Sequence, residues 1–243
     1  MESEGKIAPA RRRICGSGCG RPANVCLCRS LPSSPIETVT QIVILHHPHE
    51  QSHKLATVPL LSKCLANCHI IVGRKLRYGD SSLLDTLHDQ NLHSQPFRRA
   101  LFLFPGSDAL ALADVSQVQP SLDYADENSH VLIVFDGTWK HAKEMLLASL
   151  PFLSKFAIQV CLGFDRRLEG DSIFNSGLIL RKEPFSGCMS TMEAVARCLR
   201  ILEPNGVEIE SRIIVVLKAM VGFQASFLKS IPKLTHEQRR GEH

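Results

Sequence analysis

The stretch His130-Val131-Leu132-Ile133-Val134-Phe135-Asp136-Gly137-Thr138-Trp139 decides the fold, because it joins an uninterrupted apolar run to a polar turn. Residues 140–150 follow with apolar side chains at helical spacing, so the sequence predicts a buried strand that leads directly into a helix. The strand delivers Asp136 to the carboxyl edge of a sheet. Asp136 is then either a functional carboxylate or the N-cap of the helix, with Gly137 in a tight turn and Trp139 in the core. The pattern alone leaves both interpretations open.

The same alternation of apolar run and helical pattern recurs along the chain. Further buried strands are predicted at residues 39–45, 70–72 and 101–104. Helices are predicted to start at Thr57 with Pro59 in the first turn, to cover residues 81–92 with Asp80 as N-cap, and to cover residues 191–202. This alternation indicates an α/β fold with a mostly parallel sheet covered on both faces. Ligands of such sheets bind just past the carboxyl ends of the strands.

Composition limits the class of protein. The chain has 243 residues, of which 44% are hydrophobic, enough for one main domain and a small appendage. A formal net charge of +4 and a pI near 8.6 permit an acidic partner such as nucleic acid without requiring one. The first residues carry acids instead of an apolar run, and no stretch approaches the roughly 18 apolar residues of a membrane span. We therefore expect an intracellular protein of the cytoplasm or nucleus.

Four of the nine cysteines, Cys15, Cys19, Cys26 and Cys28, lie in one short Gly-rich segment. Four thiolates at such spacing are the ligand set of a closed, structural Zn²⁺ site, and free thiols in a loose leader are the alternative. A Pro/Ser-rich joint at residues 31–35 ends the segment. We therefore expect a disordered leader over residues 1–13, a zinc-binding segment over 14–35, the main α/β domain over 36–232 and a tail over 233–243.

A histidine cluster, His46-His47-Pro48-His49-Glu50 with His53 following, comes directly after the first predicted strand. In isolation, His47 and His49 at a strand end could be ligands of a metal-dependent hydrolase. A (β/α)8 barrel of that class typically uses about 250 residues, more than this chain provides after its cysteine segment. Solvated loop histidines are the more common case, and this hydrolase is the least favoured of the functions considered.

Several blocks together resemble the DTW-domain family of tRNA-uridine aminocarboxypropyltransferases. Asp136-Gly137-Thr138-Trp139 is similar to the family's Asp-x-Thr-Trp signature, and further similar blocks follow the family's order. These are Cys19-Gly20-Arg21-Pro22 with Cys26-Leu27-Cys28, His47-Pro48-x-Glu50, Gly73-Arg74, Phe104-Pro105-Gly106, Arg181-x2-Pro184 and Cys188-Met189-Ser190-Thr191-Met192-Glu193. The resemblance extends from about residue 15 to 227. Two departures are the three residues between Cys15 and Cys19, where two are common, and Met189 in place of Leu.

The resemblance implies a fold related to SPOUT-type RNA methyltransferases, with a C-terminal knot that binds S-adenosylmethionine. It also implies transfer of the 3-amino-3-carboxypropyl group of S-adenosylmethionine to N3 of a tRNA uridine, with release of methylthioadenosine. Asp136 is the candidate base for the N3 proton, because its strand places a carboxylate at the sheet edge. The expected cofactor-binding residues are Pro105, Gly106, Asp136, Gly137, Thr138, Trp139, Arg181, Ser190, Thr191 and Glu193. For Glu193, an ordinary helix-start acid is the alternative.

A basic segment after the second predicted strand is the candidate RNA-binding surface. Arg74, Lys75 and Arg77 combine cations with the aromatic Tyr78, which suits backbone contact plus base stacking, and His47 is added from its block. Three pairs could extend this surface: Arg98-Arg99, Arg166-Arg167 and Arg181-Lys182. A solvated charged face is the alternative for any single pair. Two other functions stay open, an RNA methyltransferase with the same cofactor and a zinc-containing RNA-binding module without catalysis.

Overall fold

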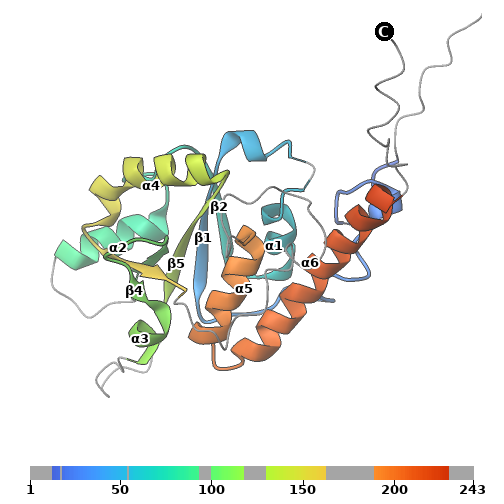
Figure 1. The fold of residues 1–243 in the computed structure, drawn as a ribbon. Helices are drawn as coiled ribbons and strands as arrows, with labels where there is room; N and C mark the ends of the chain where they lie inside the picture. Colours follow the sequence, from blue (N-terminus) through green and yellow to red (C-terminus); the bar gives the residue numbers. More distant parts are fainter. Residues whose placement is uncertain are drawn as a thin grey trace, which may run out of the picture.

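The computed structural model describes residues 13–16, 18–53, 55–92, 100–117, 130–162 and 189–229. In this part of the chain, six strands form one sheet in the order β2-β1-β5-β3-β6-β4, and every pairing is parallel (Figure 1). The strands are β1 Gln41–His46, β2 Cys68–Val72, β3 Ala100–Leu103, β4 Leu110–Ala111, β5 Val131–Asp136 and β6 Ala157–Cys161. The predicted α/β class with a mostly parallel sheet is therefore confirmed.

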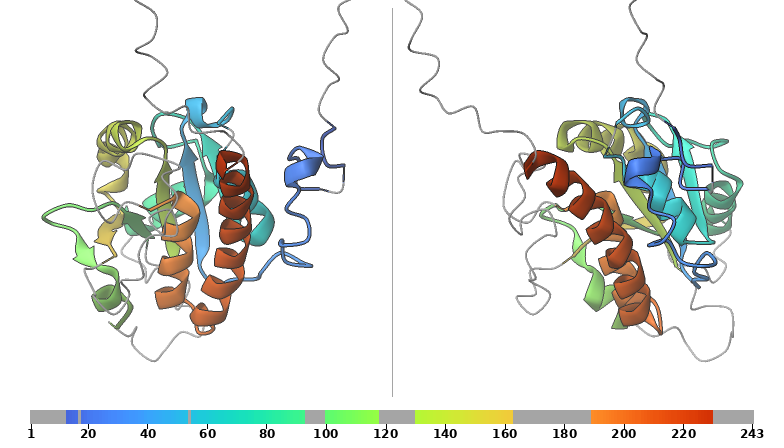
Figure 2. Two further views of the ribbon diagram at one scale, coloured as in Figure 1. Left: turned by 45° about the vertical axis from the view of Figure 1, so that its right-hand side comes forward. Right: turned by 90° about the vertical axis from the view of Figure 1, so that its right-hand side faces the viewer.

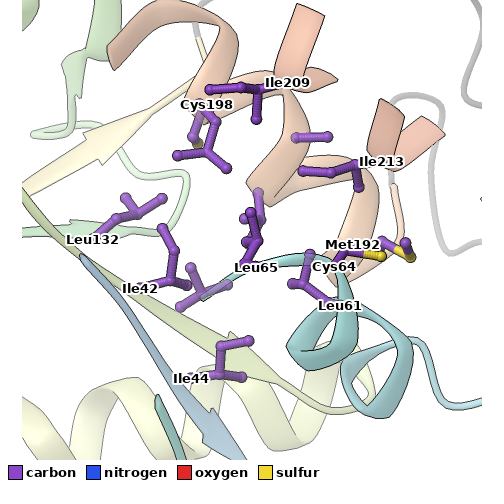
Figure 3. Packing of buried hydrophobic residues seen from close by; sticks show 14 of the residues in the cluster. Ile42, Ile44, Leu61, Cys64, Leu65, Leu132, Met192, Cys198, Ile209 and Ile213 are labelled. Atoms are coloured by element: carbon purple, nitrogen blue, oxygen red, sulfur yellow. The ribbon is translucent and has the colours of Figure 1, made fainter. Parts of the chain in front are cut away.

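Helices cover both faces of the sheet (Figures 1 and 2). They are α1 Val58–Cys64, α2 Ser82–Leu92, α3 Leu112–Gln117, α4 Trp139–Leu153, α5 Thr191–Leu202 and α6 Gly206–Lys229, with short 3-10 turns η1 Ala23–Val25 and η2 Pro48–Glu50. Successive β1 side chains point to opposite faces. Ile42 and Ile44 pack with α1, α5 and α6, as Figure 3 shows, whereas Val43 and Leu45 pack in the cluster that includes α2 and α4.

Most predicted elements are present, with shifted ends. The strand predicted at residues 39–45 runs from Gln41 to His46, and Thr57 is the N-cap of α1. The prediction of Asp80 as a helix cap is wrong. The Ser81 hydroxyl accepts the Leu84 N–H at 3.4 Å, while the Asp80 carboxylate bonds Arg77 instead. The sequence analysis missed the short β4 and α3, as well as β6 and α6.

The strand order creates a switch point between β1 and β5. After β1 the chain continues to β2 on one side, and after β5 it continues through α4 to β6 on the other. Loops that diverge in this way leave a crevice at the carboxyl ends of the two strands, where parallel sheets bind ligands. The register pairs His46 with Asp136 at these ends. At the opposite end, the Glu203 carboxylate accepts the N–H groups of Val39 and Thr40 at 3.0 and 2.7 Å, which fixes the start of β1.

The cysteine segment is attached to the core by an apolar anchor. Leu27 is fully buried and belongs to the hydrophobic cluster on the α5 and α6 face. An isolated parallel bridge also joins Ile36 to Leu65 after α1. The predicted C-terminal knot stays a prediction, and residues 163–188 lie outside the described residues. Within the described ranges, no helix has the length and apolar character needed to cross a membrane.

Candidate functional site at the carboxyl edge of the sheet

Asp136 ends β5 and is only 8% exposed. Its Oδ2 lies 2.6 Å from His46 Nδ1, and its Oδ1 accepts the hydroxyl of Thr191 at the start of α5. Elements distant in the sequence thus meet at one carboxylate. The N-cap of α4 is Thr138, whose Oγ1 accepts the His141 N–H at 3.3 Å. The interpretation of Asp136 as a simple helix cap is therefore wrong, and its catalytic role stays a prediction.

Trp139 is 38% exposed, so the alternative of a core tryptophan is also wrong. Its ring stacks on Phe104, with centroids 5.1 Å apart and planes 23° from parallel. Phe104 directly follows β3 and leads into the exposed Pro105 and Gly106. A side chain at Gly106 would collide with the Gln159 amide, since an added Cβ would lie 2.7 Å from Nε2. These contacts place the predicted 105–106 loop beside an aromatic wall at the same edge as Asp136.

Three predicted residues lie at the start of α5. Ser190 caps the helix, since its Oγ accepts the Glu193 N–H at 3.2 Å, and Thr191 reaches Asp136. The Glu193 carboxylate is fully buried and pairs with Arg197 at 2.8 Å. This contact fits the alternative of a structural helix-start acid, and a cofactor role for Glu193 stays a prediction. Arg181, with Pro184 and Cys188 of the neighbouring blocks, lies outside the described residues.

A histidine cluster adjoins Asp136. The His47 ring stacks on His141 at 3.9 Å between centroids, and His49 lies edge-on to both at 4.8 and 5.5 Å. Burial lowers the pKa of His47, and the charges of His141, His49 and Arg74 lower it further, against the effect of Glu50. His47 therefore favours the neutral imidazole. The sequence analysis missed His141, because its proximity to His47 depends on the pairing of β1 with β5.

Only some of the candidate RNA-binding residues lie near Asp136 at the carboxyl edge of the sheet. The Gly73 N–H donates to His46 O at 3.1 Å, which brings the loop after β2 to the same edge, and Arg74 is close enough to His47 to act on its pKa. Arg74, Lys75 and Arg77 are all exposed. Arg77 bonds Asp80, and the Tyr78 hydroxyl donates to Asp89 at 2.9 Å. The predicted extensions at residues 98–99, 166–167 and 181–182 lie outside the described residues.

The four predicted cysteine ligands converge. The Sγ atoms lie 3.4 Å apart for Cys15 and Cys26, 3.5 Å for Cys15 and Cys28 and 3.7 Å for Cys19 and Cys26. A tetrahedral zinc with bonds of 2.3 Å requires sulfurs about 3.8 Å apart, so the four side chains can hold one metal ion.

The thiol electrostatics fit the same conclusion. Although burial opposes it, hydrogen bonds with the Arg21 and Leu27 backbone lower the pKa of Cys19. The Cys28 backbone lowers the pKa of Cys26, but hydrogen bonds shared with the neighbouring thiols outweigh it and raise that pKa to about 12. Ionising a second thiol beside an existing thiolate is unfavourable, and a bound cation removes that cost.

The sheet, its switch point and the buried acid there define an α/β domain whose strand ends are the candidate ligand site. A family model described as "DTW domain" matches residues 12–225. The chain is 45% identical to "tRNA-uridine aminocarboxypropyltransferase A" of Arabidopsis thaliana, over 96% of this chain and 90% of that protein. It is 33% identical to "tRNA-uridine aminocarboxypropyltransferase 2" of Mus musculus, over 88% and 64%. No solved structure matches. The chain belongs to the DTW-domain family.

Proposed function

We propose that this chain transfers the 3-amino-3-carboxypropyl group from S-adenosylmethionine to N3 of a uridine in tRNA. The observation that carries the proposal is the buried Asp136, oriented by His46 and Thr191 at the switch point of the sheet. These contacts orient a carboxylate at the edge where parallel α/β sheets bind their ligands. The names of the relatives support the same reaction, and the similarity to the plant protein extends over 90% of its length.

The polar edge suits the donor molecule. The aminocarboxypropyl arm carries a carboxylate, and helix N-terminal amides such as those around Gly137 and Thr138 bind anions. The stacked Trp139 and Phe104 beside Pro105 and Gly106 offer an aromatic surface for an adenine ring. Family resemblance assigns further residues to the S-adenosylmethionine site, namely Ser190, Thr191, Glu193 and Arg181, of which Arg181 lies outside the described residues. The same resemblance assigns the C-terminal knot to this site. When bound, S-adenosylmethionine supplies an electrophilic carbon next to its positively charged sulfur.

The protein's chemical task is then small. Each carboxylate oxygen can accept two hydrogen bonds, and the described contacts use one position on each oxygen of Asp136. A remaining position can take the proton of uridine N3. The N3 electron pair forms the new N–C bond while the C–S pair returns to sulfur, so methylthioadenosine leaves uncharged and needs no general acid. His46 and Thr191 hold the carboxylate in one orientation during this transfer.

We expect methylthioadenosine to accumulate in step with modification of the RNA. The test is to incubate the full chain with unmodified tRNA and S-adenosylmethionine, then to quantify both the nucleoside mass shift and the released thioether. One methylthioadenosine per modified uridine supports the proposal. Release of S-adenosylhomocysteine with a methylated nucleoside would assign the chain to the methyltransferase alternative.

We propose one structural zinc ion per chain, held by Cys15, Cys19, Cys26 and Cys28. Metal analysis of protein purified under reducing conditions should find stoichiometric zinc. Cys28→Ser should clearly lower the temperature of unfolding, because the metal folds its segment around the four sulfurs. Its effect on S-adenosylmethionine affinity should be small. Cys161→Ser, at a cysteine outside the cluster, is the matched control and should keep the metal. Absence of zinc from the reduced wild-type chain would contradict this assignment.

The exposed Arg74, Lys75 and Arg77 are proposed to contact tRNA phosphates together with His47. Changing the three cations to Glu should weaken tRNA binding and make it less dependent on salt. Each lost phosphate contact should reduce the slope of log binding constant against log salt concentration by about 0.7 to 0.9. Affinity for S-adenosylmethionine should stay unchanged. Lys140→Glu with Lys143→Glu, on the exposed side of α4, provides a control charge change. An unchanged slope in the triple variant would show that this loop faces away from the RNA.

Asp136→Asn tests the proposed base most directly, because Asn keeps the size and one acceptor oxygen of Asp136 while losing its charge. Turnover should fall by about 100-fold or more, the usual scale for a positioned base, while tRNA binding stays near normal. Higher pH should partly restore turnover, since uridine then ionises without help.

Thr191→Val is the matched comparison for Asp136→Asn, because it removes one hydrogen bond to Asp136 and leaves the carboxylate. It should cost less activity and show no rescue at high pH. Near-normal turnover of folded Asp136→Asn protein would remove Asp136 from the chemistry.

A further inference from the structure

His47, His49 and His141 have no assigned chemical role as a group, yet their rings form a compact cluster. One nitrogen of each ring lies within 4.8 Å of the others. The His141 Nδ1 is shielded from solvent and has no hydrogen-bond partner among the described residues. A buried nitrogen of this kind is costly unless something bonds it. The cluster therefore has both the donor atoms and an unsatisfied group that a cation would satisfy.

The backbone holds the three histidines in place. The His47 N–H donates to Asp136 O at 2.9 Å, which ties the end of β1 to the end of β5. An added Cβ at Gly137 would lie 3.0 Å from His141 Cβ and 3.4 Å from His47 Cβ. A larger residue at position 137 would therefore crowd the His141 side chain and push against His47. The cluster is a consequence of the sheet register and of this one small residue.

We propose that His47, His49 and His141 form a second metal site, which binds a first-row divalent cation such as Zn²⁺ or Co²⁺ through three imidazoles. Imidazole nitrogen suits these metals and disfavours Mg²⁺ and Ca²⁺, which prefer oxygen. Three protein ligands leave one coordination position for water, unlike the closed four-cysteine cluster. The buried Glu50 adds negative charge near His47, which offsets the nearby positive charge of Arg74.

Binding requires a small adjustment of the rings. Metal–nitrogen bonds of 2.0–2.1 Å place tetrahedral ligand atoms about 3.4 Å apart. This is closer than the 4.8 Å within which the three ring nitrogens lie. His47 Nδ1 accepts the His49 N–H at 3.3 Å, a long hydrogen bond. A metal on His47 Nε2 would place the ring proton on Nδ1, which could then no longer accept the His49 N–H. The exposed His49 side chain can follow the metal without disturbing the core.

Cobalt titration of the full chain, loaded beforehand with one equivalent of zinc to fill the four-cysteine cluster, tests the site. Co²⁺ should bind as one further equivalent, and its ligand-field bands should appear without thiolate-to-cobalt charge transfer. His49→Gln and His141→Gln should each weaken this binding by at least about tenfold, the scale seen even for loss of supporting partners at metal sites. His69→Gln, at an exposed histidine on β2, is the matched control and should leave the affinity unchanged.

Gly137→Ala is an independent variant, because it keeps all three ligands and adds a Cβ that crowds His141 and His47. It should also weaken Co²⁺ binding, with the fold checked by circular dichroism. Failure to bind a further equivalent, equal affinity in His49→Gln, or a signal carrying only thiolate charge transfer would overturn the proposed site. The titration needs neither tRNA nor S-adenosylmethionine, so its failure would leave the transferase proposal standing.

Discussion

The parallel pairing of β1 with β5 is the constraint on which the functional edge depends. Its register sets His46 opposite Asp136, and the 2.6 Å contact between their side chains closes the end of the pair. The two strands are central and apolar, with fully buried residues on both faces. A slip of one residue would turn every β1 side chain to the other face and disrupt the packing of both hydrophobic clusters, so the core itself enforces the register. The apolar packing of the core therefore fixes the positions of His46 and Asp136 at the edge of the sheet.

Topology then gathers other segments around this pair. Because the chain leaves β1 and β5 in opposite directions, the ends of these two strands form the switch point of the sheet. The start of α5 fills one side and contributes Thr191, while the loop after β3 brings Phe104 against Trp139. The Asp136 side chain is therefore held by groups from β1 and α5, two elements that are distant in the sequence. These contacts orient the carboxylate without a long loop of its own. This arrangement suits a reaction that depends more on aligning the reactants than on a large number of catalytic groups.

The two clusters of metal-binding side chain types differ in origin. The four cysteines lie within one short segment that has few apolar residues of its own, apart from anchors such as Leu27. Bringing their sulfurs together depends mainly on local turns, and a bound cation would offset the repulsion between the thiolates. The three histidines come from two distant segments, and their proximity is a by-product of the β1–β5 pairing and of Gly137. The first cluster can be recognised from spacing, and the second cannot.

The sequence by itself determined the α/β class, the central strands, the four-cysteine cluster and the position of Asp136 at a strand end. These features follow from apolar periodicity and local spacing, which are properties of neighbouring residues. Only the tertiary structure decided that Thr138 instead of Asp136 caps α4, that Trp139 lies partly exposed against Phe104, and that His141 joins His47. These outcomes depend on strand order and register, which are set by the summed burial of the whole core. No local pattern encodes which strand lies beside β5, so the partners of Asp136 became visible only in the folded chain.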